Sequence, residues 1–171
     1  MVSPVSMGFA LAGGTYFSLR YRHRQLINLD FFATIALTIE ELINKLQFYG
    51  FPLQETFYTN SPGVFGYLEG VKVDFVRHDQ FPMIRAIEEI DGIRLFGDDD
   101  LMAMKAAAIL RRSVKKDFWD VAELLQHYSL KHFIEACHRK YPQHHLLISI
   151  QRALAILMSQ KALPSPIVFA A

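Results

Sequence analysis

Hydrophobic residues in the first hundred positions form short runs separated by turn residues, a pattern typical of β-strands. Two further stretches have the spacing of helices. Residues 15–22 place apolar side chains at helical intervals, and Thr38-Ile-Glu-Glu41 is a capping-box pattern that opens a helix ending at Tyr49. We predict strands at 9–12, 26–32, 56–59, 64–68 and 71–76, and a β-hairpin from 86–90 and 93–96 around Asp91-Gly92.

The pattern changes to helical spacing from Asp98 onward. Helices are predicted at about 100–112, 117–127, 130–140 and 144–160. No repeat, low-complexity tract or flexible linker separates this part from the strands. We therefore predict one α+β domain over residues 1–171, with a mixed sheet in 1–97 and a helical part in 98–171.

Composition narrows the class of protein. The chain has 171 residues, of which 51% are hydrophobic and 20% charged, and its formal net charge is +1. These values exclude a disordered tail and a protein that coats nucleic acid by bulk charge. Cys137 is the single cysteine, which excludes a disulfide framework. The apolar stretches at 7–14 and 146–158 are shorter than the about 20 residues that a bilayer requires, so we predict a cytoplasmic protein outside the membrane.

The segment between Gly13 and Phe32 carries the most informative chemistry. A Gly13-Gly14 turn between a strand and a helix leaves backbone N–H groups that can bind phosphate. Strand alternation then places Asn28 and Asp30 on one face of the next strand, and Leu29 and Phe31 on the other. Taken singly, a glycine pair is also a tight turn, and an Asn-x-Asp pair is also turn chemistry.

Asp74 lies within the apolar run Val71-Lys-Val-Asp-Phe-Val76. A carboxylate there is costly unless it is paired, exposed or bound to metal, and an exposed place on an edge strand is the simplest alternative. A phosphate-binding turn next to carboxylates indicates phosphoryl transfer, because Mg²⁺ binds carboxylates together with substrate phosphates.

Six motifs follow one another along the chain: Leu11-Ala-Gly-Gly-Thr15, His23-Arg24, Asn28-Leu-Asp-Phe-Phe32, Val73-Asp-Phe75, Met104-Lys-Ala-Ala-Ala-Ile109 and Lys116-Asp-Phe-Trp-Asp-Val-Ala-Glu-Leu-Leu125. In their residues and order, over about residues 9–125, the chain resembles the AbiEii/AbiGii-type nucleotidyltransferase family. The resemblance implies a DNA polymerase β-like nucleotidyltransferase fold, with a twisted mixed sheet flanked by helices. It also implies transfer of a nucleotide from an NTP, with Mg²⁺ or Mn²⁺, to an acceptor hydroxyl, which for some members belongs to tRNA. Many members are toxins of toxin–antitoxin or abortive-infection systems, so a cognate antitoxin is an expected partner.

The resemblance also implies roles for individual residues. Asp30 and Asp74 would hold the metal, and Asp74 would also be the base for the acceptor hydroxyl. Gly13, Gly14 and Thr15 would receive the triphosphate, and Arg24 would brace the site. Lys105 would contact the nucleotide phosphates, and Asp117 and Asp120 would order that lysine or a substrate sugar. Asp117 also suits a helix start, and Asp120 also suits a pair with Lys116 one turn earlier.

Asn28 departs from the family pattern, which has a metal-binding Asp at this position, and Leu26 replaces a Ser. Asn offers a neutral carbonyl oxygen, and the lost charge is expected to cost at least about 10–100-fold in activity. Two alternatives therefore remain open. One is a catalytically impaired member that acts as an NTP-binding or protein-interaction module; the other is a structural domain that docks a partner through apolar residues 146–158 and 167–171.

Other polar groups are secondary candidates. Asp98-Asp-Asp100 suits a helix N-terminus far better than a cation site. Basic residues near the motifs form a local patch that suits a triphosphate and an RNA end: Arg20, Arg22, Arg24, Arg111, Arg112, Lys115 and Lys116.

Overall fold

The computed structural model describes residues 8–22, 28–36, 38–57, 63–112 and 114–142. The predicted helix at 144–160, the apolar end at 167–171, Arg24 and Leu26 lie outside these residues. The described part contains the elements β1 (Phe9–Ala12), α1 (Gly13–Tyr21), β2 (Asn28–Ala33), α2 (Ile39–Phe48), β3 (Gln54–Phe57), β4 (Gly63–Leu68), β5 (Val71–Arg77), β6 (Glu88–Ile90), β7 (Ile93–Leu95), α3 (Asp98–Arg112), α4 (Lys115–His127) and α5 (Leu130–Lys140).

The chain divides into two compact units. The sheet unit comprises Met1–Tyr16, Leu26–Phe81 and Ile87–Phe96, and the helical unit comprises Phe17–Gln25, Pro82–Ala86 and Gly97–Ala171. The α+β class and the predicted helical C-terminal half are therefore confirmed, whereas the single domain over 1–171 stays a prediction. None of the described helices is long and apolar enough to cross a membrane.

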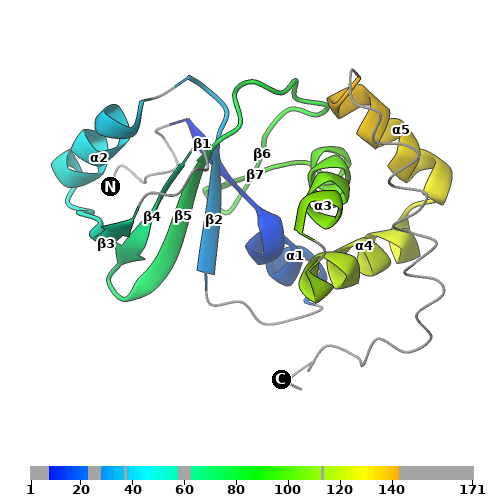
Figure 1. Cartoon of the computed structure of the whole chain (residues 1–171), viewed down its shortest axis with the longest axis horizontal. Helices are drawn as coiled ribbons and strands as arrows, with labels where there is room; N and C mark the ends of the chain where they lie inside the picture. Colours follow the sequence, from blue (N-terminus) through cyan, green and yellow to red (C-terminus); the bar gives the residue numbers. More distant parts are fainter. Residues whose placement is uncertain (1–7, 23–27, 37, 58–62, 113, 143–171) are drawn as a thin grey trace. The chain divides into compact units, whose positions relative to one another are not determined.

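The sheet unit is built on a seven-stranded mixed sheet with the order β3-β4-β5-β2-β1-β7-β6 (Figure 1). The pairs β2–β5 and β1–β7 are parallel, and the other neighbouring pairs are antiparallel. β6 ends the sheet on one side, and its three residues are all exposed. The hairpin predicted at Asp91-Gly92 is confirmed as the β6–β7 connection, with positive φ at both turn residues.

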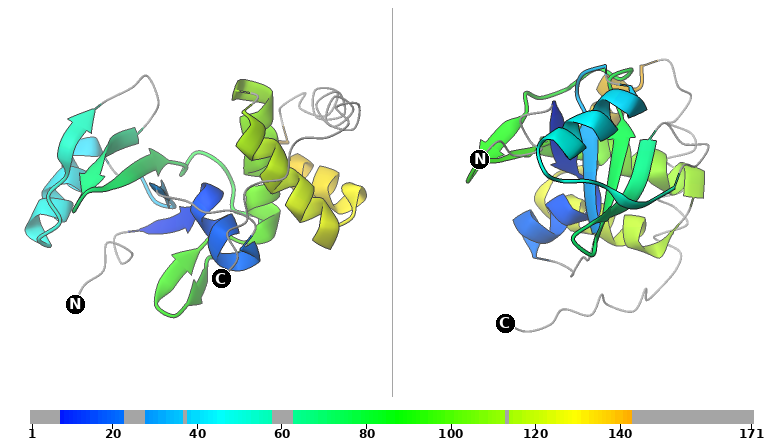
Figure 2. Two further views of the ribbon diagram at one scale, coloured as in Figure 1. Left: turned by 90° about the horizontal axis from the view of Figure 1, so that it is seen from below. Right: turned by 90° about the vertical axis from the view of Figure 1, so that its left-hand side faces the viewer.

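One face of this sheet is covered by α2, which crosses the strands in Figure 2 (right). The predicted capping box is present, because Thr38 accepts a hydrogen bond from the backbone of Glu41 and Glu41 accepts one from the backbone of Thr38. Leu42 and Leu46 of α2 are buried in a cluster with Phe9, Ala33, Val64, Val73 and Phe75, and Leu29 and Phe31 pack against it. The apolar side of β2 and β5 therefore faces α2, and the polar side faces the other way.

The helical unit has its core along α3, α4 and α5. Leu101, Met102, Val121, Leu124 and Phe133 are all 1% exposed or less. Cys137 is 2% exposed, and burial raises the pKa of its thiol to about 12. Cys137 therefore belongs to the core of this unit.

Candidate active site

The polar face of β2 and β5 gathers the predicted metal residues of the sheet unit. The two strands run parallel and in register, so that Asn28 lies opposite Lys72 and Asp30 lies opposite Asp74. Residues two apart on a strand share a face, and residues in register on neighbouring strands share it too. The predicted separation of Asn28 and Asp30 from Leu29 and Phe31 is confirmed by the packing of the latter two against the core.

Gly13 lies directly against Asp30. The glycine adopts φ +64°, and a Cβ on it would come within 3.0 Å of the Asp30 Cγ and still closer to the carboxylate oxygen Oδ2. Only glycine therefore allows the backbone at the start of α1 to approach this carboxylate so closely. The Gly13-Gly14 pair forms the first turn of α1 and not a separate loop, because the helix begins at Gly13.

Thr15 fixes the start of α1 to the beginning of β2. Its hydroxyl donates a short hydrogen bond to the backbone carbonyl of Asn28. Thr15 is 7% exposed, so this bond is largely shielded from water. The predicted phosphate-binding turn and the predicted metal strand are thus held together at one end of the sheet unit.

Lys72 adds a cation to this face. Its Nζ lies 2.7 Å from Oδ1 and 3.0 Å from Oδ2 of Asp74, and the two side chains are 29% and 18% exposed. Both carboxylate oxygens of Asp74 therefore accept from one ammonium group. The sequence pattern gave no role to Lys72, because a lysine alternating with valines is typical of any solvated strand face.

The donor set on this face suits a hard divalent cation. Asp30 and Asp74 supply carboxylate oxygens and Asn28 supplies an amide oxygen, which is the ligand chemistry that Mg²⁺ prefers. Within the described ranges, no three acidic, histidine or cysteine side chains group together as a metal site. Two carboxylates on adjacent strands are therefore the acidic ligands that this face offers.

The other predicted nucleotide contacts lie in the helical unit, where they form a buried ionic network. Lys105 Nζ lies 3.0 Å from Oδ1 of Asp117 and 2.5 Å from Oδ2 of Asp120. Lys105 is 5% exposed and both carboxylates are fully buried. The Lys105 ammonium also lies 5.4 Å from the centre of the Phe17 ring, a cation–π distance. Acidic residues that order a lysine would make such contacts, and the roles of Lys105, Asp117 and Asp120 toward a nucleotide stay predictions.

Arg112 completes the network from the end of α3. Its Nε and Nη2 donate to the two carboxylate oxygens of Asp117 at 2.7 and 2.8 Å. Burial raises the pKa of Asp117, but the bonds from Arg112 and Lys105 outweigh it and hold the pKa below its usual range. The Lys-Asp-Phe-Trp-Asp motif does not by itself indicate that Arg112 pairs with Asp117. That pairing depends on the end of α3 lying beside the start of α4 in the folded chain.

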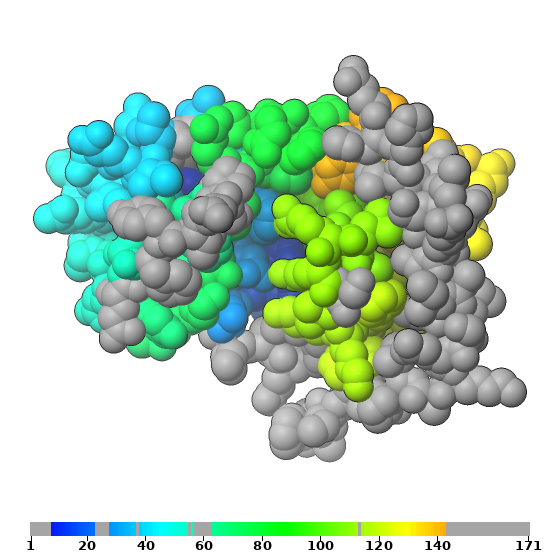
Figure 3. Space-filling model, in the orientation of Figure 1, coloured from blue at the N-terminus to red at the C-terminus, as the bar shows by residue number. Residues whose placement is uncertain are grey.

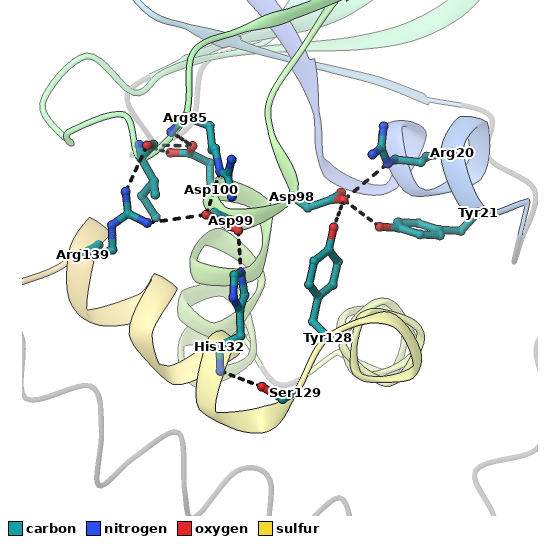
Figure 4. A network of polar contacts seen from close by, with 11 residues as sticks. Arg20, Tyr21, Arg85, Asp98, Asp99, Asp100, Tyr128, Ser129, His132 and Arg139 are labelled. Atoms are coloured by element: carbon teal, nitrogen blue, oxygen red, sulfur yellow. Dashed lines mark hydrogen bonds and ion pairs between the residues drawn. The ribbon is translucent and has the colours of Figure 1, made fainter.

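Asp98, Asp99 and Asp100 are bound by protein groups of the helical unit (Figure 4). Asp98 accepts from Tyr21 and Tyr128, Asp99 pairs with Arg85 and His132, and Asp100 pairs with Lys140. Asp100 also accepts from the backbone N–H groups of Ile84 and Arg85. The three carboxylates therefore join α3 to its neighbours.

Several predicted basic residues of the helical unit reach its surface. Atoms from the end of α3 and the start of α4 lie on the face drawn in Figure 3, in yellow-green. The exposed members are Arg20, Arg22, Arg111, Arg112, Lys115 and Lys116.

Comparison with known proteins identifies the family of this chain. A family model described as "Nucleotidyl transferase AbiEii toxin, Type IV TA system" matches residues 2–167. The chain therefore belongs to the AbiEii nucleotidyltransferase toxin family, and the resemblance predicted from its motifs is confirmed.

One relative and two solved structures are similar to this chain. The uncharacterized protein aq_aa25 of Aquifex aeolicus (strain VF5) is 30% identical over 145 residues, which cover 80% of this chain and 70% of that protein. The putative nucleotidyltransferase from H. pylori has a TM-score of 0.53 at 18% identity and covers 90% of this chain and 85% of its own. The antibiotic-resistance factor ANT(2'')-Ia has a TM-score of 0.57 at 11% identity, covering 90% and 88%. At these identities the two structures support the nucleotidyltransferase fold.

Proposed function

We propose that this protein transfers a nucleotide from an NTP to an acceptor hydroxyl with the help of Mg²⁺ or Mn²⁺. The observation that carries the proposal is the register of Asp30 with Asp74 on one face of the sheet, with Gly13 against the Asp30 carboxylate. Membership in the AbiEii family supports the same reaction.

Each candidate residue of the sheet unit has a proposed role in this reaction. Asp30 and Asp74 would hold the cation, with the Asn28 amide oxygen as a neutral third ligand. The cation, when bound, polarises the α-phosphoryl group and stabilises the charge that develops on it. The N–H groups at the start of α1, from Gly13, Gly14 and Thr15, would receive the triphosphate, because a helix N-terminus favours anions. Asp74 would accept the proton of the acceptor hydroxyl, and pyrophosphate would leave.

The helical unit supplies the remaining candidates. The family resemblance assigns Lys105 to the nucleotide phosphates, with Asp117 and Asp120 ordering it and Arg24 as a brace. Exposed basic residues at the end of α3 and the start of α4 would bind an RNA acceptor such as tRNA by its phosphates. A cognate antitoxin protein is the partner that membership in a toxin family suggests.

Labelled nucleotide transfer tests the proposal. The full chain is incubated with each radiolabelled NTP, Mg²⁺ or Mn²⁺ and total tRNA, beside Asp30→Asn and Asp74→Asn variants. We expect incorporation by the wild type and a loss of at least about 100-fold in each variant, because each removes a charged metal ligand. The matched control is Asp79→Asn, which removes a carboxylate paired with Arg77 beyond the end of β5 and should retain activity. Equal activity in all four proteins would contradict the proposal.

Asn28 favours a second candidate, an impaired member that binds NTP without turnover. In that case Asn28→Asp would restore incorporation that the wild type lacks, while both proteins would gain thermal stability from NTP and Mg²⁺. Absence of both incorporation and any NTP-induced thermal shift in the two proteins would contradict both nucleotide functions. It would leave partner docking as the remaining function.

A further inference from the structure

The candidate metal face carries a fixed cation as well as carboxylates. Lys72 lies in register with Asn28, and Asp74 lies in register with Asp30, so the four positions form a square on adjacent parallel strands. The lysine thus lies opposite the position where an amide replaces the family's carboxylate. At this pair of positions the chain therefore lacks the negative charge of the family pattern, at Asn28, and carries a positive charge, on Lys72.

The contact between Lys72 and Asp74 is close and two-pronged. The ammonium lies 2.7 and 3.0 Å from the two carboxylate oxygens. Each side chain is less than one-third exposed, so water screens this pair less than a pair on the open surface. A bidentate charge-assisted contact of this kind keeps the ammonium beside the carboxylate.

The charges of the four side chains limit how many metal ions the face can hold. Asp30 and Asp74 contribute −2, Lys72 contributes +1 and Asn28 contributes nothing, which gives −1. No further acidic, histidine or cysteine group in the described chain joins them as a metal cluster. Two divalent ions 3.5–4 Å apart repel one another about four times as strongly as two unit charges at that distance. Two carboxylates, of which Asp74 is bound to Lys72, offset less of that repulsion than three carboxylates without a lysine would.

We propose that this site binds one divalent cation, and that the Lys72 ammonium replaces a second. The inference rests on the proposed nucleotidyltransferase function and specifies its metal requirement. Lys72 is then a positioning residue, because it acts through Asp74 by neutralising part of its charge. Its ammonium would supply, through Asp74, a positive charge at this face that needs no second ion from solution. The substitution at position 28 is consistent with this arrangement, because a carboxylate there would serve a second metal that the lysine makes unnecessary.

Counting bound metal tests the inference without relying on turnover. The full-length protein is placed in equilibrium dialysis with Mn²⁺ and, one at a time, the non-hydrolysable α,β-methylene analogues of the four NTPs. Both Mn²⁺ and analogue are measured on each side of the membrane. We expect one Mn²⁺ and one analogue per wild-type chain. Two Mn²⁺ per wild-type chain would overturn the inference and leave the proposed function intact. No bound Mn²⁺ and no bound analogue would overturn the proposed function.

Variants at positions 28 and 72 then test the role of Lys72. Lys72→Met/Asn28→Asp should bind two Mn²⁺ per chain, whose magnetic coupling is visible by electron paramagnetic resonance. Lys72→Met alone should bind its single Mn²⁺ at least about tenfold more tightly, since a repelling charge has been removed. Lys72→Arg should keep the wild-type values, and so should Lys45→Met, which removes an exposed lysine from α2. Unchanged Mn²⁺ number and affinity in both Lys72→Met proteins, with wild-type circular dichroism, would overturn the role of Lys72.

Discussion

At the scale of single residues, Gly13 is constrained both by its backbone conformation and by its contact with Asp30, a candidate metal ligand. Its φ of +64° favours glycine, and a Cβ would also collide with the Asp30 carboxylate. We predict that Gly13→Ala lowers the free energy of unfolding by about 1–2 kcal/mol through the backbone alone. It should also reduce Mg²⁺-dependent NTP binding, because Asp30 must move to make room.

Gly70→Ala is the matched control for this prediction. Gly70 also has positive φ, at +79°, but a Cβ there would meet nothing within 4 Å. Its stability loss should equal only the backbone part of the Gly13→Ala loss, about 1–2 kcal/mol, and its NTP binding should be that of the wild type. Chemical denaturation and nucleotide titration measure the two effects separately. Equal NTP binding by the two variants would contradict the role given to Gly13.

Some residues of the candidate site could be predicted from sequence at this scale, and others could not. Asn28, Asp30 and Asp74 were identifiable because alternation along a strand is a local rule, and the family motifs include these positions. Alternation also places Lys72 and Asp74 on one face of β5, but it does not tell which face of the folded sheet that is. That face is set by the position of α2, a long-range packing that alternation alone does not supply.

At the scale of elements, the buried pairing of α3 with α4 determines how the helical unit responds to mutation. Lys105 of α3 lies between Asp117 and Asp120 of α4, both fully buried. Removing the lysine would leave the Asp120 carboxylate without this cation in a dry environment. We predict that Lys105→Met destabilises the protein by about 3–5 kcal/mol, measured by chemical denaturation.

Two further variants sharpen this prediction. Lys105→Met/Asp120→Asn should recover part of the lost stability, because the carboxylate is removed together with its cation. Lys131→Met removes an 87% exposed lysine from α5 and should change stability by less than about 0.5 kcal/mol. A small effect of Lys105→Met on stability, together with loss of NTP binding, would instead favour a direct phosphate contact.

Elements with local signals were predicted accurately from the sequence. The capping box places the start of α2, and Asp91-Gly92 places the β6–β7 turn, because both signals act within four residues. β3 lies two residues earlier than predicted, at Gln54–Phe57, because its position is set by pairing with β4. α3 begins at Asp98, two residues early, because all three aspartates have partners elsewhere in the helical unit, some more than 30 residues away.

At the scale of the whole molecule, the buried carboxyl groups of Asp99 and Asp117 link stability to pH. Burial raises the pKa of Asp99, but bonds from His132 and Arg85 outweigh it and leave the pKa lowered, as they do for Asp117. A carboxyl group whose pKa is lower in the folded than in the unfolded chain stabilises the fold at pH values above the unfolded pKa of about 3.9. That contribution is lost as pH falls through the folded pKa.

We therefore predict that the free energy of unfolding falls steeply below about pH 4. The Asp99→Asn variant should show a shallower fall, because the group that binds the proton has been removed. Asp91→Asn, which removes an exposed carboxylate from the β6–β7 turn, should follow the wild-type curve. Urea denaturation from pH 2.5 to 7 measures all three. A wild-type slope in the Asp99→Asn variant would contradict the assignment.

The short strand β6 has a consequence for the behaviour of the protein at high concentration. An outermost strand offers unpaired backbone groups to any second chain, and sheets with long, flat, apolar edges tend to aggregate. β6 has only three residues, two of which are Glu88 and Glu89, and all three are exposed. Two copies that approached edge to edge would bring these carboxylates together. Like charge therefore disfavours self-association along this border of the sheet.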